Sequence, residues 1–296
     1  MSSLERVNST NSALQQYSNP PAYYTKYYKR MTRMHGLEIW LSTLLPILIC
    51  TTVLWAISLK LKNASIIDIF WGLGFVIVFW LTSYQSPHEN QFQINLLGAT
   101  VTLWGLRLSA HILFRSSGKG EDARYAKFRA NSGRSWWWSS LFKVFILQGL
   151  LIWIIAAPIS ITQVAPLQIE PLVYFGFFTW LVGFIFEAGG DLQLARFKSN
   201  PKNKGRLLTT GLWSLTRHPN YFGDATQWWG FWLMSLSQYT WWTIFSPVLM
   251  TILLLRFSGV PITEKMMLRD KPGYATYIDS VPAFTPNILN IFRSNQ

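Results

Sequence analysis

The 296-residue sequence has almost no cysteine and little histidine, and both scarcities exclude certain sites. With a single thiol at Cys50, the chain cannot build a disulfide framework or a thiolate metal cluster. No two histidines stand four residues apart, the spacing that holds zinc on one helix face. The histidines are His35, His88, His111 and His218.

Charge is scarce as well. Charged residues make up 13% of the chain, about half of the ~25% found in an ordinary soluble domain. Half of the residues are hydrophobic, 16% are aromatic, and the mean hydropathy is +0.20. This composition excludes a disordered chain and disfavours a soluble nucleic-acid binder, although the net charge is +13. We therefore expect an integral membrane protein.

Long apolar runs predict the fold class, an all-α polytopic membrane protein with about seven transmembrane helices. A bilayer core of ~30 Å needs about 20 apolar residues per helix. The stretch 221–257 is long enough for two helices with a break at Ser237–Tyr239. The other five runs lie near 37–59, 66–85, 92–114, 136–157 and 170–190.

Basic residues alternate between the loops that join these runs. Under the positive-inside rule, this alternation places the C-terminus in the cytoplasm. The basic N-terminal segment would then lie outside, against the rule. Lysine and arginine occur in the loops 60–65, 115–135 and 191–220 and in the C-terminal tail, but not in the loops 86–91, 158–169 and 238–240.

The N-terminal residues 1–36 differ in composition from the rest. They lack a compact apolar core and a small-residue cleavage site, so we expect no secretory signal there. A start rich in Ser, Asn and Gln, followed by interleaved Tyr, Lys and Arg, predicts a disordered arm that becomes interfacial. Residues 37–296 are expected to form a single integral membrane domain.

Ionisable side chains inside the apolar runs are functional candidates, because charge at membrane depth is costly. Asp68 stands near the start of the second run, Arg107 lies inside the third, and Asp224 is near the start of the sixth. Glu187 and Asp191, at the end of the fifth, are four residues apart and share a helix face. Two explanations stay open: the groups line a polar cavity, or they form buried ion pairs, such as Asp68 with Arg107.

Two polar segments have further features. Residues 118–125 mix both charge signs, which predicts a folded loop or, alternatively, a solvated charge run. In the segment 211–224, Pro219 can open a helix. Arg217, His218, Asn220 and Tyr221 would then surround a helix N-terminus, where an anion is favoured. The alternative is a loop that merely caps a transmembrane helix.

These motifs resemble the membrane steroid 5-alpha-reductase-like family, most of all a bacterial branch described as a domain of unknown function. The Arg-His-Pro-Asn-Tyr-Phe-Gly run within 211–224 carries the resemblance. Arg-His-Pro and a later Glu and Tyr pair are shared with sterol reductases and isoprenylcysteine methyltransferases. Further matches, in order, lie at Asp68–Gly72, Trp104–Arg115, Glu121–Tyr125, Glu187–Lys198 and Gly259–Tyr277.

The resemblance implies a helical fold that holds NADPH on its cytoplasmic side and reduces an alkene conjugated to a carbonyl. Steroid reductases polarise the substrate ketone with a glutamate and a tyrosine, and the corresponding positions here carry Asp68 and Trp104. A protonated Asp68 would donate a hydrogen bond to the carbonyl, and Tyr221 is the third catalytic candidate. The implied cofactor-binding residues are Arg107, Glu187, Asp191, Lys198, Arg206, Arg217, His218, Asn220, Tyr221, Asp224, Arg256 and Glu264.

The expected substrate is a steroid, polyprenyl or other lipid enone, and the expected partners are membrane lipids rather than nucleic acid or metal. Two other functions stay open. One is an S-adenosylmethionine-dependent methyltransferase built around the same Arg-His-Pro motif, and the other is a lipid-binding protein without catalysis. A bacterial inner membrane follows from the family branch alone, and an endoplasmic reticulum membrane would suit the same apolar runs.

Overall fold

The structure is a computed structural model that describes residues 35–86, 91–164, 170–257 and 259–287. Regular structure in these residues is entirely helical, as predicted, whereas the greater part of the expected N-terminal arm lies outside them. Within the described residues, six helices are long and apolar enough to cross a membrane, which indicates an integral membrane protein. They are His35–Leu61, Ile66–Gln85, Gln91–Ser116, Ala123–Ile155, Glu170–Ser199 and Trp241–Asp270.

The structure therefore has one membrane-length helix fewer than the sequence predicted, and the difference lies in 221–257. The predicted break is present, because α11 (Pro219–Met234) ends before Ser237–Tyr239 and α12 (Phe245–Ile252) follows it. The 16 residues of α11 correspond to about 24 Å of helix. That length is less than the ~30 Å of a bilayer core.

Contacts divide the chain into two compact units, which we describe one at a time. Among the described residues, unit 1 holds 35–164 and 235–243, and unit 2 holds 170–234 and 244–287. That 37–296 forms a single domain stays a prediction.

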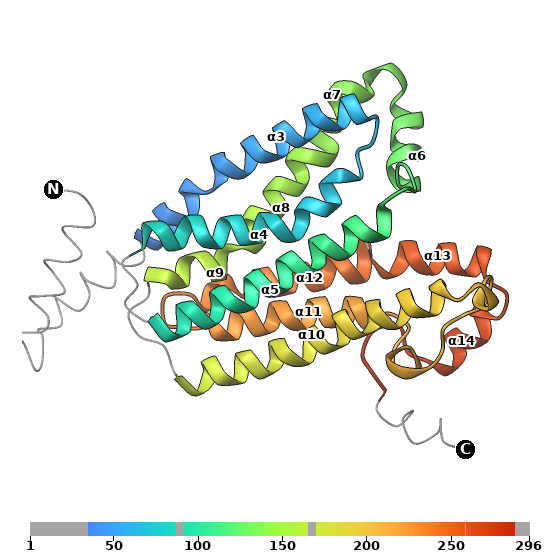
Figure 1. Ribbon diagram of the computed structural model, residues 1–296. Helices are drawn as coiled ribbons and strands as arrows, with labels where there is room; N and C mark the ends of the chain where they lie inside the picture. The colour runs from blue at the N-terminus through green and yellow to red at the C-terminus, as the bar shows by residue number, and fades with distance from the viewer. Residues whose placement is uncertain (1–34, 87–90, 165–169, 258, 288–296) are drawn as a thin grey trace, which may run out of the picture. The chain divides into compact units, whose positions relative to one another are not determined.

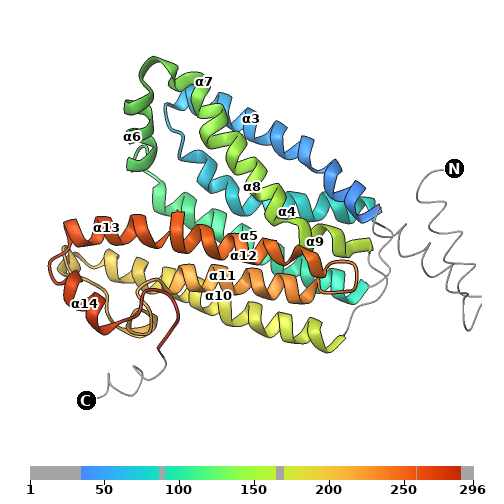
Figure 2. The ribbon, with the colours of Figure 1, turned by 180° about the vertical axis from the view of Figure 1, so that it is seen from behind.

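Unit 1 is built on the close packing of α4 (Ile66–Gln85) against α5 (Gln91–Ser116), which lie side by side in Figures 1 and 2. Gly72 and Gly105 make this approach possible, because a Cβ on Gly72 would lie 2.3 Å from the carbonyl oxygen of Gly105. The other helices of unit 1 include α3 (Leu44–Leu61), α6 (Ala123–Ser132), α7 (Trp136–Ser140), α8 (Leu147–Ile155) and α9 (Ala157–Ile161).

The helical run 123–155 changes direction after its first part. Gly133 ends α6 with a φ of 52°, a backbone conformation that favours glycine. A 3-10 turn, Gly133–Ser135, leads into α7, and the π-helical segment Leu141–Ile146 connects α7 to α8. Figure 1 shows α6 turned away from the direction of α7 and α8.

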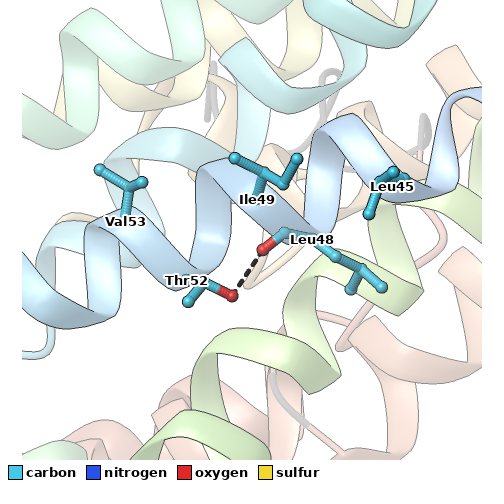
Figure 3. A pocket seen from close by; sticks show the side chains of 5 residues that line it. All are labelled: Leu45, Leu48, Ile49, Thr52 and Val53. Atoms are coloured by element: carbon cyan, nitrogen blue, oxygen red, sulfur yellow. Dashed lines mark hydrogen bonds between the residues drawn. The ribbon is translucent and has the colours of Figure 1, made fainter.

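The outer face of α3 carries a shallow apolar hollow, shown in Figure 3. Leu45, Ile49 and Val53 recur every four residues along it and are about half exposed. The hydroxyl of Thr52, which also lines the hollow, donates to the carbonyl of Leu48 at 2.7 Å. The hollow thus offers no ionisable group, and its composition is that of a lipid-facing helix surface.

Unit 2 is centred on α10 (Glu170–Ser199) and α11, which pack against each other along glycines. A Cβ on Gly183 would lie 2.6 Å from the carbonyl oxygen of Gly223, and one on Gly230 would lie 2.6 Å from the amide nitrogen of Trp180. The two backbones therefore touch, as in glycine-mediated pairs of membrane helices. The glycines are seven residues apart on each helix: Gly176, Gly183 and Gly190 on α10, and Gly223 and Gly230 on α11.

The C-terminal part of unit 2 folds back on the loop before α11. Tyr274, Tyr277 and Val281 form a small buried cluster, and the amide of Arg217 donates to the carbonyl of Pro282 at 2.9 Å. These contacts fix the segment 211–218, where the predicted site begins. The remaining elements of unit 2 are the 3-10 turns Pro201–Asn203 and Gly211–Ser214, the π-helical segment Leu253–Phe257, α13 (Val260–Asp270) and α14 (Tyr274–Ser280).

Candidate functional site

The predicted site residues fall into the two units. Unit 1 contains three of them, Asp68, Trp104 and Arg107. Unit 2 contains the others, among them the whole Arg-His-Pro-Asn-Tyr motif, so the candidate site is built here from unit 2. Its members are Glu187, Asp191, Lys198, Arg206, Arg217, His218, Asn220, Tyr221, Asp224, Arg256 and Glu264.

Arg217 is buried, and its guanidinium links several segments of unit 2 through hydrogen bonds. Its Nε and Nη2 atoms donate to Oε1 of Glu264 at 2.9 and 2.6 Å, and its Nη1 atom donates to the carbonyls of Ile278, at 3.1 Å, and Val281. Only 7% of the Arg217 side chain is exposed. The anion that its guanidinium holds is thus the protein's own carboxylate, and these hydrogen bonds join the loop before α11 to α13 and to the end of α14.

His218 and Tyr221 extend this group. Nε2 of His218 lies 3.3 Å from Oε1 of Glu264, and the imidazole stacks on the Tyr221 ring with centroids 5.3 Å apart. The Tyr221 hydroxyl lies 3.0 Å from Oγ1 of Thr263. Pro219 begins α11 as predicted, so these side chains do surround a helix N-terminus. We call Arg217, His218, Tyr221, Thr263 and Glu264 the polar cluster.

The Glu264 carboxylate uses only one of its two oxygens within the polar cluster. All three donors meet Oε1 of Glu264, whereas Oε2 accepts no hydrogen bond from any residue that the structure describes. The Glu264 side chain is 21% exposed, so this oxygen belongs to a group that solvent or a ligand can reach. The polar cluster therefore presents a carboxylate acceptor that a buried guanidinium holds in place.

We expect unit 2 to lose stability in acid because of His218. Burial lowers the pKa of this imidazole to about 4, against the attraction of Glu264, from an ordinary value of 6.5. The unfolded chain then binds more protons between these values, so the stabilisation is complete above pH 6.5 and is lost as pH falls towards 4. The loss is about 3 kcal/mol. Unfolding in detergent micelles from pH 7 to pH 4 measures it, and an equal pH dependence in His218→Gln would contradict it.

A second polar group lies between α10 and α11. The amide of Gln227 donates to Oε2 of Glu187 at 2.5 Å, and the amide of Asn220 donates to Oδ1 of Asp191 at 3.3 Å. Glu187 and Asp191 are 3% and 7% exposed. They share one face of α10, as predicted, and that face is turned towards α11. Asp224, one turn after Asn220, is half-buried.

The predicted phosphate-binding cations are on the outside of unit 2. Lys198 is exposed near the end of α10, Arg206 in the loop that follows, and Arg256 in the π-helical segment after α12. Within the described part of the chain, the guanidinium groups of Arg206 and Arg256 form neither an ion pair nor a hydrogen bond. Both are therefore available to an anionic ligand.

In unit 1, Asp68 is engaged on both oxygens. Tyr125 donates to Oδ1 at 2.5 Å and Arg124 donates to Oδ2 at 2.8 Å. The amide of Gln148 in turn donates to the Tyr125 hydroxyl at 3.0 Å. The ion pair suggested for Asp68 is therefore made with Arg124, in the segment 118–125, and not with Arg107.

The other two predicted residues of unit 1 are on α5. Trp104 is fully buried, and its ring lies against Phe75 with centroids 5.5 Å apart, so the structure places it in the core. Arg107 is half-buried, three residues further along α5. Of the two alternatives for the segment 118–125, the structure supports a folded segment over a solvated charge run, because both of its acids are bound by arginines.

Sequence reasoning missed several partners. Gln227 and Gln148 are uncharged and lie outside the matched motifs, whereas Tyr125 and Thr263 lie inside matched ranges but were given no role. Arg124 lies in the mixed-charge segment and in the matched range Glu121–Tyr125, but its pairing with Asp68 was not predicted. Each of these residues became identifiable through its contact with a predicted residue.

Comparison with known proteins places these features in a family context. The family described as "Protein of unknown function (DUF1295)" matches residues 54–281, a range that includes Asp68 and Glu264. An uncharacterized protein of Schizosaccharomyces pombe is 26% identical over 275 residues, which cover 80% of this chain and 76% of that protein. The probable O-methyltransferase ustE of Ustilaginoidea virens is 45% identical over 52 residues, 18% of each chain. No solved structure matches this chain.

Proposed function

We propose that this chain, which belongs to the DUF1295 family, is a membrane enzyme that uses NADPH to reduce a carbon–carbon double bond conjugated to a carbonyl. The substrate is a steroid-like or other lipid enone. Support comes from the resemblance of the sequence motifs to the steroid 5-alpha-reductase-like family. When bound, NADPH supplies the hydride. The chain binds the cofactor, orients it and keeps water away.

The observation that carries the proposal is the free acceptor oxygen of Glu264. Ribose hydroxyls and a nicotinamide carboxamide are hydrogen-bond donors, and a carboxylate oxygen is their natural acceptor. Arg217 and His218 hold the opposite oxygen, so Oε2 stays oriented before any ligand arrives. Such preorganisation reduces the entropy cost of binding.

The cations of unit 2 fit the other end of the cofactor. Lys198, Arg206 and Arg256 are exposed and suited to phosphate groups, which guanidinium binds in a bidentate manner. The alternative is that these cations face anionic lipid headgroups, at ~1 kcal/mol each near the surface. The two explanations differ in magnitude, because a charge-assisted contact with a bound phosphate contributes ~1.5–3 kcal/mol.

We expect Arg206→Ala and Arg256→Ala each to weaken NADPH binding about 10- to 150-fold. The reason is the loss of one charge-assisted contact with a phosphate. Calorimetric titration of the purified protein measures the affinity. Lys62→Ala is the matched control, since Lys62 is an exposed cation in the turn before α4 and in unit 1. Affinities equal to that of the control in both arginine variants would contradict the proposed phosphate contacts.

A second candidate function is methyl transfer from S-adenosylmethionine. Its support is the 45% identity over 52 residues to the probable O-methyltransferase ustE. The Glu264 carboxylate would suit the cationic ammonium of that cofactor as well as a ribose. Titration with S-adenosylmethionine separates the two candidates, because binding of that cofactor alone would favour the methyltransferase.

On the substrate side, the catalytic roles of Asp68, Trp104 and Tyr221 stay predictions. Asp68 already accepts hydrogen bonds from Tyr125 and Arg124. It could donate to a substrate carbonyl only if it were protonated and released one of these two hydrogen bonds.

The cytoplasmic C-terminus and the bacterial inner membrane belong to the same proposal. A cysteine placed near Gln296 that reacts only from the outer face would contradict this topology.

A further inference from the structure

The helix α6 is fixed to one end of the helices of unit 1. The amide of Ala64 donates to Glu121 at 2.8 Å, and the Ser65 hydroxyl accepts from the amide of Asp122 at 2.7 Å. Ala64 and Ser65 lie in the short turn between α3 and α4, two helices of membrane-crossing length. Such a turn lies where the apolar helices end, at the depth of the lipid headgroups. The hydrogen bonds therefore hold α6 beside that turn, and Figure 1 shows α6 at the end of α3 and α4 that the turn joins.

The two acids at the start of α6, Glu121 and Asp122, both form ion pairs with arginines of the same helix. Glu121 forms a bidentate pair with Arg129, at 3.0 and 2.8 Å, and Asp122 binds Arg124 at 2.9 Å. Burial raises the pKa of Glu121, but Arg129 and the Ala64 amide outweigh it and hold that pKa below its usual range. Both acids are therefore ionised at neutral pH, and they neutralise the arginines they bind.

Two cations remain uncompensated. Lys127 and Arg134 are exposed, and their side chains form no ion pair or hydrogen bond with the residues that the structure describes. Exposed aromatic residues lie close to them in sequence: Phe128 is 51% exposed, Trp137 60% and Trp138 48%. Tryptophan and other aromatic rings favour the membrane–water interface, where their apolar parts meet lipid and cations meet phosphate.

We infer that Lys127, Phe128, Arg134, Trp137 and Trp138, here called the α6 surface, bind anionic lipid headgroups. The aromatic side chains enter the interface and the two cations contact the headgroups. All phospholipids carry a phosphate, but the uncompensated positive charge selects lipids with a net negative charge over zwitterionic ones. This inference rests on the membrane fold and on the segment from α6 to α7 alone, and it is independent of the proposed reductase activity.

The test uses the intact chain in lipid nanodiscs of equal phosphatidylglycerol and phosphatidylcholine. A fluorophore at Ala130→Cys, in a Cys50→Ala background, reports quenching by headgroup-labelled copies of either lipid. Ala130 is exposed on α6, and its methyl side chain takes part in no hydrogen bond or ion pair. We expect phosphatidylglycerol to quench more than phosphatidylcholine, and this preference to vanish at high salt.

Substitutions then assign the preference to the α6 surface. Lys127→Gln with Arg134→Gln should lower the local preference by about fivefold for each cation removed. Lys127→Arg with Arg134→Lys is the matched control, because it keeps the charge and should keep the preference. Equal quenching by both lipids in the unsubstituted chain, or a preference unchanged by the glutamine pair, would overturn the inference. So would displacement of the labelled lipid by inorganic phosphate at low millimolar concentration, which would indicate a soluble anion as the ligand.

Discussion

Replacing Arg217 with methionine should destabilise unit 2 by about 3 kcal/mol or more, because it removes a buried cation and leaves the half-buried Glu264 carboxylate without its partner. The Glu264 carboxylate would lose two hydrogen bonds, and the carbonyls of Ile278 and Val281 would lose their common donor. Unsatisfied buried acceptors cost about 1–3 kcal/mol each. The free energy of unfolding in detergent micelles measures the effect.

Two further variants isolate the cause. Arg206→Ala removes an exposed arginine of the same unit and should change stability by no more than about 0.5 kcal/mol. Adding Glu264→Met to Arg217→Met should restore part of the loss, since the unpaired charge is then gone. The contrary result is that the two effects simply add. The double variant would then be less stable than Arg217→Met by as much as Glu264→Met alone lowers the free energy of unfolding, and the two side chains would not interact in this way.

Replacing Gly183 with alanine should cost about 2–3 kcal/mol, because the new methyl group has no room between α10 and α11. Its Cβ would lie 2.6 Å from the carbonyl oxygen of Gly223 and 2.7 Å from the amide nitrogen of Gln227. Both contacts are with backbone, so the helices must separate. The separation would also disturb the nearby hydrogen bond between Gln227 and Glu187.

Gly189→Ala is the matched control on the same helix. A Cβ at Gly189 meets only the flexible end of Leu212, at 3.0 Å. Alanine is the better helix former by about 1 kcal/mol, so this variant should be neutral or slightly stabilising. Thermal unfolding of the two variants in the same detergent decides the matter. Equal stabilities would mean that α10 and α11 are not held together through glycine contacts.

Features that depend on residues close together in the sequence were predicted correctly. Apolar run length predicted the six membrane-length helices, and Pro219 predicted the start of α11. The four-residue spacing of Glu187 and Asp191 correctly predicted one shared helix face. Among the described residues, the sixth predicted span is not of membrane length, because its apolar residues form the short helix α11, which packs on α10. Apolar composition alone does not distinguish a membrane-length helix from a shorter helix packed inside the protein.

Partners distant in sequence could not be predicted. Arg217 and Glu264 are 47 residues apart, and Asp68 and Arg124 are 56 apart. A single sequence shows which charges are expensive to bury, but it does not show which opposite charge the fold brings beside them. The glycine repeat of seven on α10 and α11 was present in the sequence, and its meaning required knowing that the two helices pack together.

The measurement that tests the central claim most directly is a calorimetric titration of the purified protein with NADPH and, separately, with S-adenosylmethionine. The account predicts saturable binding of NADPH at one site per chain, weakened in Arg206→Ala and Arg256→Ala and unaffected in Lys62→Ala. Saturable binding of S-adenosylmethionine with none of NADPH would contradict the assignment as a reductase. Binding of neither cofactor would contradict it as well.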